Sequence, residues 1–174
     1  SASLPLIYLT DDTPANPAVA PNFCMLLRKH INGGKILSIT QPGLERILHF
    51  HIEHLNEMGD VCEKILIVEL MGKHSNIIFL DNAGMIIDSI KHISHQISSV
   101  REVLPGRTYM APPVHNKGSL EAVTPEWMEE VLLKKASTVQ KGIYTSLSGI
   151  SPMFANELCY RAGIDGSAAM ASLL

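Results

Sequence analysis

The sequence predicts an α+β protein, in which an antiparallel β-meander sheet packs with a helix and is followed by a small helical segment. Three observations lead to this class. A helical repeat of apolar residues near the start gives way, after Asn32-Gly33-Gly34, to five short stretches with alternating apolar and polar residues. Short polar breaks separate the five stretches, which indicates antiparallel neighbours because a parallel crossover needs a dozen or more residues. After residue 108 the alternation stops and helix signals replace it.

The composition limits the classes of function. The chain has 174 residues, of which 46% are hydrophobic and 18% charged, with a net charge of −3 at pH 7. This is typical of a folded soluble protein, and any nucleic-acid-binding surface must be local. The three cysteines form no CxxC pair, so a reducing compartment fits better than a disulfide or metal framework. We expect no signal peptide and no membrane insertion, and the absence of an initial methionine suggests a piece of a longer protein.

Residues 1–108 form the predicted β-rich domain. The loosely alternating stretch 4–10 predicts a first strand, and a proline-rich loop follows it. Apolar residues at three- and four-residue spacing predict a helix over residues 23–31. The meander strands are expected at residues 35–41, 47–55, 63–71, 76–80 and 85–90. One face of this sheet should be buried, against the helix over 23–31.

The remainder of the chain is predicted to be a linker and a helical domain. Residues 109–123 contain two adjacent prolines and no periodicity, which is typical of a linker. Residues 124–174 form the helical domain. Thr124 as N-cap and Pro125 at the first helical position predict a helix that runs to about residue 135. Further helices are expected near 139–147 and 152–162, and a fourth is expected to begin in 168–174.

The polar break between residues 72 and 76 is the first candidate site. Gly72-Lys73 followed by Ser75 resembles the end of a phosphate-binding loop, but the first glycine of that loop would fall at Ile67, so the loop is excluded. Lys73 and His74, beside a hydroxyl and an amide group, can instead contact an anion. The alternative is a hairpin tip that is merely polar.

Glu45 and Arg46 form the second candidate, at a strand entrance directly after a Pro42-Gly43 turn. An arginine in this position can form a forked contact with a phosphate or a base edge while the neighbouring carboxylate orients it. The alternative is a solvated ion pair that contributes little to stability.

A third candidate is the hairpin Gly149-Ile150-Ser151 between two predicted helices. A tight connection of this kind presents the first backbone N–H groups of the second helix, and these groups bind phosphate without regard to sequence. The alternative is a hairpin that only packs. Ser151 stands where glycine is usual, which weakens one of the amide approaches.

No catalytic constellation is predicted. His49 and His51 share one face of a predicted strand, but no third ligand gives a recognisable zinc set, and histidines on a wet face are the simpler interpretation. The sequence contains no nucleophile elbow, catalytic carboxylate pair or cofactor loop. We therefore expect no catalytic residues, no metal and no cofactor.

Several stretches together resemble one known family. They are Pro21-Asn22-Phe23-Cys24-Met25-Leu26-Leu27-Arg28-Lys29-His30, Gln41-Pro42-Gly43-Leu44-Glu45-Arg46-Ile47, Glu69-Leu70-Met71-Gly72-Lys73-His74-Ser75-Asn76-Ile77-Ile78, Ile87-Asp88-Ser89-Ile90-Lys91 and Leu104-Pro105-Gly106. In this combination the chain resembles the fibronectin/fibrinogen-binding protein family, also called the NFACT or RqcH family, over nearly its whole length.

The resemblance implies a fold and a set of boundaries. Residues 1–108 would be a truncated amino-terminal NFACT domain similar to the formamidopyrimidine-DNA glycosylases, and residues 124–174 would contain a helix-hairpin-helix. The start of the amino-terminal domain and the later coiled-coil and RNA-binding regions would be missing. The glycosylase catalytic group belongs at a processed terminus outside this chain, so repair chemistry is not expected here.

The resemblance also implies partners. Family members bind tRNA and the large ribosomal subunit during rescue of stalled ribosomes in the cytoplasm, and in bacteria they support C-terminal alanine tailing. The family's tRNA-recruiting Asp-Arg pair falls on Glu45 and Arg46, of which Arg46 matches and Glu45 is one methylene longer. Lys73 and His74 are expected to help hold tRNA phosphates. The alternative is an adhesin that binds host fibronectin or fibrinogen at the cell surface without a signal peptide, and both activities can coexist.

Overall fold

The computed structural model describes residues 4–113 and 117–173. The chain divides into two units, residues 1–112 and residues 113–174, and each is described by itself.

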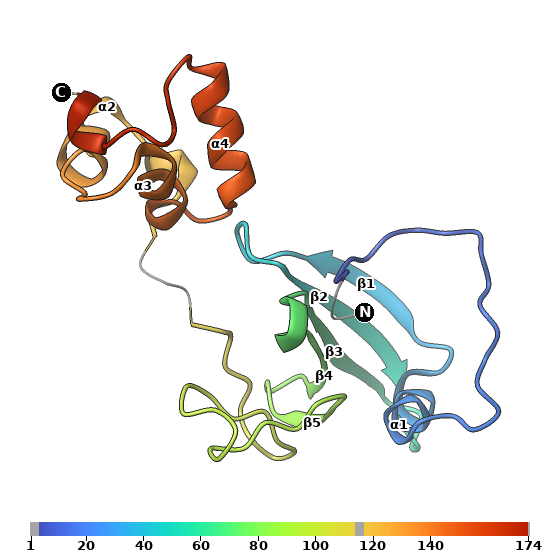
Figure 1. The fold of residues 1–174 in the computed structure, drawn as a ribbon. Coiled ribbons are helices and arrows are strands. Elements are labelled where there is room, and N and C mark those ends of the chain that lie inside the picture. The colour runs from blue at the N-terminus through green and yellow to red at the C-terminus, as the bar shows by residue number, and fades with distance from the viewer. Residues whose placement is uncertain (1–3, 114–116, 174) are drawn as a thin grey trace. The chain divides into compact units, whose positions relative to one another are not determined.

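An antiparallel five-stranded sheet forms most of the first unit (Figure 1). Its strands follow one another in chain order, as predicted for a meander. They are β1 (Lys35–Thr40), β2 (Ile47–Leu55), β3 (Val61–Glu69), β4 (Asn76–Asp81) and β5 (Ile86–Ser89). The predicted fold class is confirmed, and the main difference is that β3 begins and ends two residues earlier than expected.

The turn between β2 and β3 shows how short polar breaks produce the meander. The Asn56 Oδ1 atom accepts hydrogen bonds from the backbone N–H groups of Met58 and Asp60, both at 2.9 Å. Gly59 has a φ of 86°, a left-handed conformation that favours glycine. A side chain that bonds to its own turn in this way reverses the chain within a few residues.

The larger core lies on one face of the sheet. Side chains at paired positions share a face, so the rows that contain Ile47, Ile67 and Ile78 point the same way. These residues pack with Leu80, Ile86 and Val103, and all six are buried. Val103 belongs to the irregular segment 90–110, which covers this face and pairs with itself through Ile93 and Val103.

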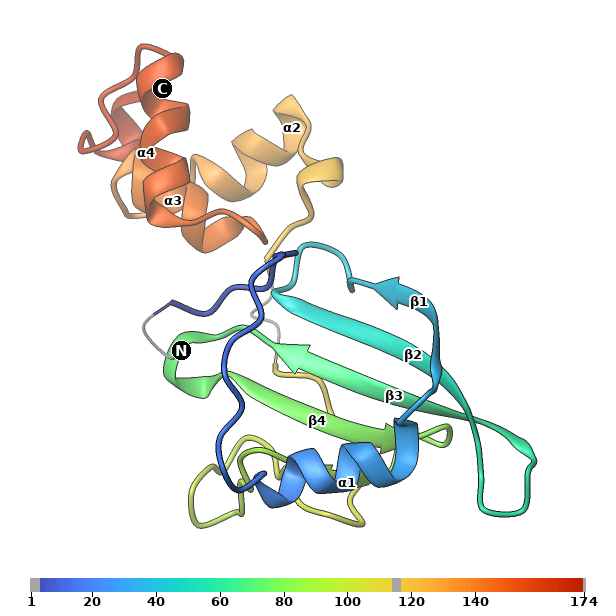
Figure 2. The same cartoon turned by 90° about the vertical axis from the view of Figure 1, so that its right-hand side faces the viewer.

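Helix α1 (Asn22–Ile31) packs on the opposite face. The ring of His30 lies 5.8 Å from that of Phe79, whose neighbours along β4 point to the first face. Figure 2 shows α1 beside β4. The predicted packing of a helix on the sheet is therefore observed, but none of the helix residues is fully buried. The segment 90–110, which has no helical or strand periodicity, covers the better-buried face.

The predicted strand over residues 4–10 is wrong. The segment is extended but forms no strand pairing within the described chain, and Leu9 is fully exposed. Alternation alone does not make a strand, because a strand also needs a partner for its backbone groups. Pro5, Leu6 and Ile7 instead border a cavity of about 450 Å³ beside Val68 and Ile77.

The second unit is helical. It contains the 3₁₀ turn η2 (Leu120–Ala122), α2 (Pro125–Trp127), the π-helical turn η3 (Met128–Leu132), α3 (Val139–Ser146), α4 (Pro152–Arg161) and the 3₁₀ turn η4 (Met170–Leu173). Thr124 caps α2 as predicted, since its Oγ1 atom accepts a hydrogen bond from the Trp127 N–H at 3.2 Å. The helix expected to reach residue 135 is instead one α-turn continued by a π-turn that ends at Leu132.

Two small clusters form the core of this unit. Leu132, Val139, Cys159 and Met170 make one of them, and Leu147, Ile150 and Ala155 make the other. Trp127 packs against both clusters and so connects them. The expected fourth helix within 168–174 is the short turn η4, whose residue Met170 is completely buried.

Candidate nucleic-acid interface

The sheet register brings two of the predicted sites to the same end of the sheet. Ile47 pairs with Glu69, and Glu69 pairs with Asn76, so the start of β2, the end of β3 and the start of β4 are aligned. Glu45 and Arg46 precede this row, and the connection that carries Lys73 and His74 extends beyond it. Figure 2 shows both connections at one end of the sheet.

Backbone hydrogen bonds hold Arg46 in place. Its carbonyl accepts from the Leu70 N–H at 2.8 Å, which ties the entrance of β2 to the exit of β3. The preceding turn is closed by a bond from the Glu45 N–H to the Pro42 carbonyl at 3.0 Å, and the Gln41 amide donates to the Glu45 carbonyl at 2.7 Å. The backbone of the Glu-Arg pair is therefore ordered by its neighbours on both sides.

The side chain of Arg46 is exposed, and Glu45 is half-buried. Within residues 4–113 and 117–173, no carboxylate lies within 4 Å of the Arg46 guanidinium, and Glu45 forms no ion pair. The solvated ion pair considered from the sequence is therefore not formed between these two residues. An arginine held in place by its backbone, with its guanidinium free of protein carboxylates, is suited to a phosphate ligand.

Lys73 and His74 lie on a single 3₁₀ turn, η1 (Gly72–His74). Gly72 has a φ of 56°, and the Ser75 N–H donates to the Gly72 carbonyl at 3.0 Å. The Ser75 hydroxyl accepts from the Met71 N–H at 2.9 Å, so it fixes the turn from within. Both Lys73 and His74 are exposed.

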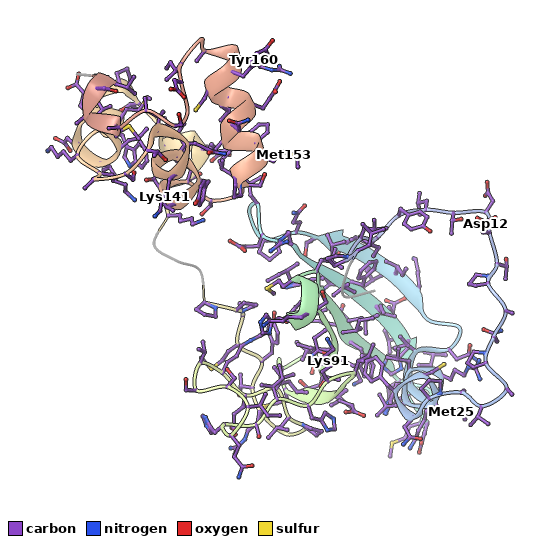
Figure 3. The ribbon with its side chains drawn as sticks, in the orientation of Figure 1. Asp12, Met25, Lys91, Lys141, Met153 and Tyr160 are labelled. Atoms are coloured by element: carbon purple, nitrogen blue, oxygen red, sulfur yellow. The ribbon has the colours of Figure 1, made fainter. Side chains whose placement is uncertain are left out.

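The structure adds Lys91 to this end of the sheet, although the sequence analysis did not single it out as a site residue. The Lys91 ammonium donates to the Lys73 carbonyl at 3.0 Å. Asn76 holds the backbone of Lys91 on both sides, because its Oδ1 accepts from the Lys91 N–H at 3.0 Å and its Nδ2 donates to the Lys91 carbonyl at 2.9 Å. Figure 3 marks Lys91 within the first unit. Asn76 and Lys91 are fifteen residues apart, so no local sequence pattern could have predicted this contact.

A buried ion pair lies directly behind this surface. Glu69 has no exposed surface, and both of its carboxylate oxygens accept hydrogen bonds from the guanidinium of Arg101. The Tyr109 hydroxyl donates to Glu69 Oε1 at 2.9 Å. Burial and the neighbouring Glu69 carboxylate both raise the pKa of Tyr109, which keeps its hydroxyl protonated as a donor. The Arg101 guanidinium is therefore bound to Glu69 in the interior, and the pair stabilises the backbone that underlies this surface.

His49 lies close to this buried pair, with its ring 6.5 Å from that of Tyr109. Burial, followed by the charge of His51, lowers the pKa of His49. The two histidines share a strand face as predicted, but this face is not the wet one that was expected, because the residues paired with His49 and His51 are Ile67 and Ile65 of the larger core. The described residues contain no group of three His, Cys, Asp or Glu side chains that could hold a metal ion.

In the second unit, α3 and α4 form the predicted helix hairpin around Gly149, whose φ is 75°. Ile150 is buried in the core, so its side chain has a packing role. The Ser151 hydroxyl accepts from the Phe154 N–H at 3.1 Å and caps α4. Within the described part of the chain, the backbone N–H groups of Gly149 and Ile150 have no protein acceptor. Met153 and Tyr160 project from α4 and are largely exposed (Figure 3).

Comparison with known proteins identifies the family to which this chain belongs. The family model for the NFACT N-terminal and middle domains matches residues 1–173. The chain belongs to the NFACT family. A relative from Bacillus subtilis, named as an Rqc2 homolog RqcH, is 46% identical over 160 residues, which are 91% of this chain and 28% of the relative.

Solved structures agree with the family assignment. The N-terminal domain of fibronectin-binding protein PavA from Streptococcus pneumoniae superposes with a TM-score of 0.76 at 36% identity, over 90% of this chain and 58% of that structure. The N-terminal part of the fibronectin/fibrinogen-binding protein from Streptococcus suis gives 0.76 at 35% identity, over 94% of this chain and 61% of that structure. The chain spans 28% of the length of the Bacillus subtilis relative. No described helix is long and apolar enough to cross a membrane.

Proposed function

We propose that this NFACT chain is a non-catalytic binding module of a ribosome quality-control factor. In the cytoplasm it binds tRNA and the large ribosomal subunit during rescue of stalled ribosomes and C-terminal alanine tailing. The observation that carries the proposal is the exposed side chain of Arg46, whose guanidinium has no carboxylate partner in the described chain and whose backbone carbonyl accepts a hydrogen bond from the Leu70 N–H.

The surroundings of Arg46 support an RNA contact. Lys73, His74 and Lys91 lie at the same end of the sheet, and each is exposed. A local group of cations on a chain of net charge −3 attracts phosphates without making the whole molecule basic. In this proposal Arg46 contacts tRNA, Glu45 orients the nucleotide by accepting from a base amine, and Lys73 and His74 hold phosphate.

The helix hairpin of the second unit is a further RNA contact in this proposal. Gly149, Ile150 and Ser151 precede a helix of ten residues, and the N–H groups of Gly149 and Ile150 have no acceptor among the residues that the structure describes. The amides and the helix dipole both favour a phosphate at this position. Ser151 already uses its hydroxyl to cap the helix, so its contribution is through the backbone.

The test is to measure the affinity of the chain for tRNA by fluorescence anisotropy over a salt titration. Arg46→Ala should weaken binding roughly tenfold, since one charge-assisted hydrogen bond contributes about 1.5 kcal/mol or more, and should reduce the slope of log K against log salt by about one. Arg28→Ala is the matched control, because Arg28 is an exposed arginine on α1. Equal affinity and equal slope for Arg46→Ala and the unmodified chain would remove the assigned role.

A second candidate function is the binding of fibronectin or fibrinogen at the cell surface. Two solved relatives carry these names, and β1 offers a specific feature: it is the edge strand of the sheet, and all six of its residues are exposed. An exposed edge with apolar side chains such as Ile36 and Ile39 can capture an extended segment by strand addition. Surface plasmon resonance with fibronectin and with tRNA at matched salt separates the two functions, and saturable fibronectin binding without tRNA binding would favour the second.

A further inference from the structure

The turn formed by Asn32 and Gly33 connects α1 to β1 and takes no part in the function proposed above. Asn32 is the C-cap residue of the helix, and Gly33 has a φ of 73°, a left-handed conformation that favours glycine. Both residues are exposed. Asn32 is also the only asparagine of the chain that precedes a glycine.

The amide side chain of Asn32 is unrestrained. Within residues 4–113 and 117–173, no hydrogen bond holds it. Other asparagines differ in this respect. The Asn56 side chain accepts two backbone N–H groups of its own turn, and the Asn76 amide accepts from and donates to the backbone of Lys91. An amide that is bound in this way cannot turn toward its own backbone without losing these hydrogen bonds.

The peptide group that follows Asn32 is also free to turn. In the described chain the Gly33 N–H has no acceptor, and a Cβ atom placed on Gly33 would meet nothing within 4 Å. The ψ of Asn32 is 128°, so rotation about this bond must bring the Gly33 nitrogen to the Asn32 Cγ atom. A glycine in open space permits this rotation, because it has no Cβ to clash. The next fixed point is Gly34, whose N–H donates to the Ile31 carbonyl at 3.0 Å.

We propose that Asn32 is a site of spontaneous deamidation, a modification that consumes only water. The Gly33 amide nitrogen loses its proton to solvent and attacks Cγ of Asn32. The N–Cγ bond forms, the Cγ–Nδ2 bond breaks, and the leaving group takes up a proton and departs as ammonia. Water then opens the cyclic imide. Cleavage of the N–Cγ bond gives aspartate, whereas cleavage of the bond from nitrogen to the main-chain carbonyl carbon gives isoaspartate.

Both products place a negative charge at the end of α1. A carboxylate is unfavourable beside the partial negative charge of a helix C-terminus, but the basic residues Arg28, Lys29 and His30 in the last turn offset this. Isoaspartate also adds one carbon to the main chain directly before Gly34. Gly34 is closely packed, since a Cβ atom there would lie 3.0 Å from the Glu53 carbonyl oxygen. The modification therefore acts at the junction between the helix and the sheet.

The experiment is to incubate the folded chain in mildly alkaline buffer and to follow each asparagine over time by mass spectrometry of its peptides. We expect Asn32 to be converted to a mixture of aspartate and isoaspartate at least about tenfold faster than Asn56, because glycine leaves the attack unhindered. A parallel incubation in urea separates the folded turn from the bare dipeptide. If Asn32 reacts in urea but stays intact in the folded chain, the proposal is overturned.

Two variants test the assignment. Asn32→Gln keeps an exposed amide but moves it by one methylene, so conversion at this position should fall at least about tenfold, because the attack depends on proximity and orientation. The acidic isoforms that ion-exchange chromatography separates from the incubated chain should then disappear. Asn82→Gln, in an exposed turn before Ala83, is the control and should leave these isoforms unchanged. Thermal melts confirm that both variants fold. Equal amounts of acidic isoforms in the two variants would also overturn the proposal.

Discussion

Arg101 binds both carboxylate oxygens of Glu69, thirty-two residues away in the chain, at the point where β3 ends behind the surface that carries Arg46. The Glu69 side chain is fully buried and that of Arg101 is 10% exposed. The pair therefore holds the irregular segment 90–110 against the sheet, and it also satisfies a carboxylate that could not remain charged in the core alone.

Removing one partner of this pair should be strongly destabilising. Arg101→Met should cost about 3–5 kcal/mol in the free energy of unfolding, because Glu69 is left as an uncompensated buried charge. Urea unfolding followed by far-UV circular dichroism, which detects the loss of the sheet, measures this. Lys29→Met is the control, since its exposed pair with Glu57 should contribute at most about 1 kcal/mol. In a double-mutant cycle, Glu69→Gln should recover part of the loss, and strict additivity would show that the two residues are not coupled.

Lys91 should contribute to tRNA affinity together with Arg46. Lys91→Met removes a cation from the same end of the sheet, so binding should weaken several-fold and the salt slope should fall by about one. The measurement is anisotropy with labelled tRNA over a salt titration. Lys64→Met is the matched control, because Lys64 lies toward the opposite end of the sheet. Identical behaviour of the two variants would indicate a diffuse effect of net charge.

The N-cap of α4 should contribute measurably to the stability of the second unit. Ser151→Ala removes the acceptor for the Phe154 N–H and should cost about 1 kcal/mol, whereas Ser151→Gly should cost only a few tenths. Thermal unfolding of the two variants and of the unmodified chain gives the comparison. If alanine and glycine behave alike, the hydroxyl does not cap the helix in solution.

Gly118 should tolerate no larger residue. A Cβ atom at this position would lie 2.9 Å from Cζ2 of Trp127, and an indole ring cannot move aside as a flexible chain end can. Gly118→Ala should therefore destabilise the second unit by about 1–3 kcal/mol. Because Trp127 is the only tryptophan, its fluorescence spectrum should shift as well. Gly163→Ala meets no such atom but has a φ of 68°, so it separates backbone strain from steric overlap.

Stability should fall as pH is lowered from about 7 to 5. The pKa values of His30 and His49 in the folded chain are below the ordinary value of 6.5, chiefly because of burial. The unfolded chain therefore binds more protons through this range, and the free energy of unfolding decreases as pH falls. His49→Gln should flatten the curve of stability against pH, measured by urea unfolding. His74→Gln, at an exposed turn, is the control, and an equal flattening by both would contradict the assignment.

Local patterns account for most of the secondary structure that was predicted correctly. The β2–β3 turn is encoded by Asn56 and Gly59 themselves, and the starts of α2 and α4 are marked by Thr124 and Ser151 followed by proline. The same reasoning failed at residues 4–10, where alternation is present without a strand partner, and at the π-turn that follows Trp127. In both places the outcome depends on what the segment packs against.

The sequence by itself therefore determined the meander and the helix starts, because alternation, turn chemistry and capping act between near neighbours. The roles of Glu45, Arg46, Lys73 and His74 stay predictions. Only the tertiary structure decided which sheet face holds the larger core, that Glu69 is paired with Arg101, and that Lys91 lies against the turn of Lys73. These contacts join residues separated by many positions, and their free energy depends on burial and on distance in space. Neither quantity is present in the order of residues along one chain.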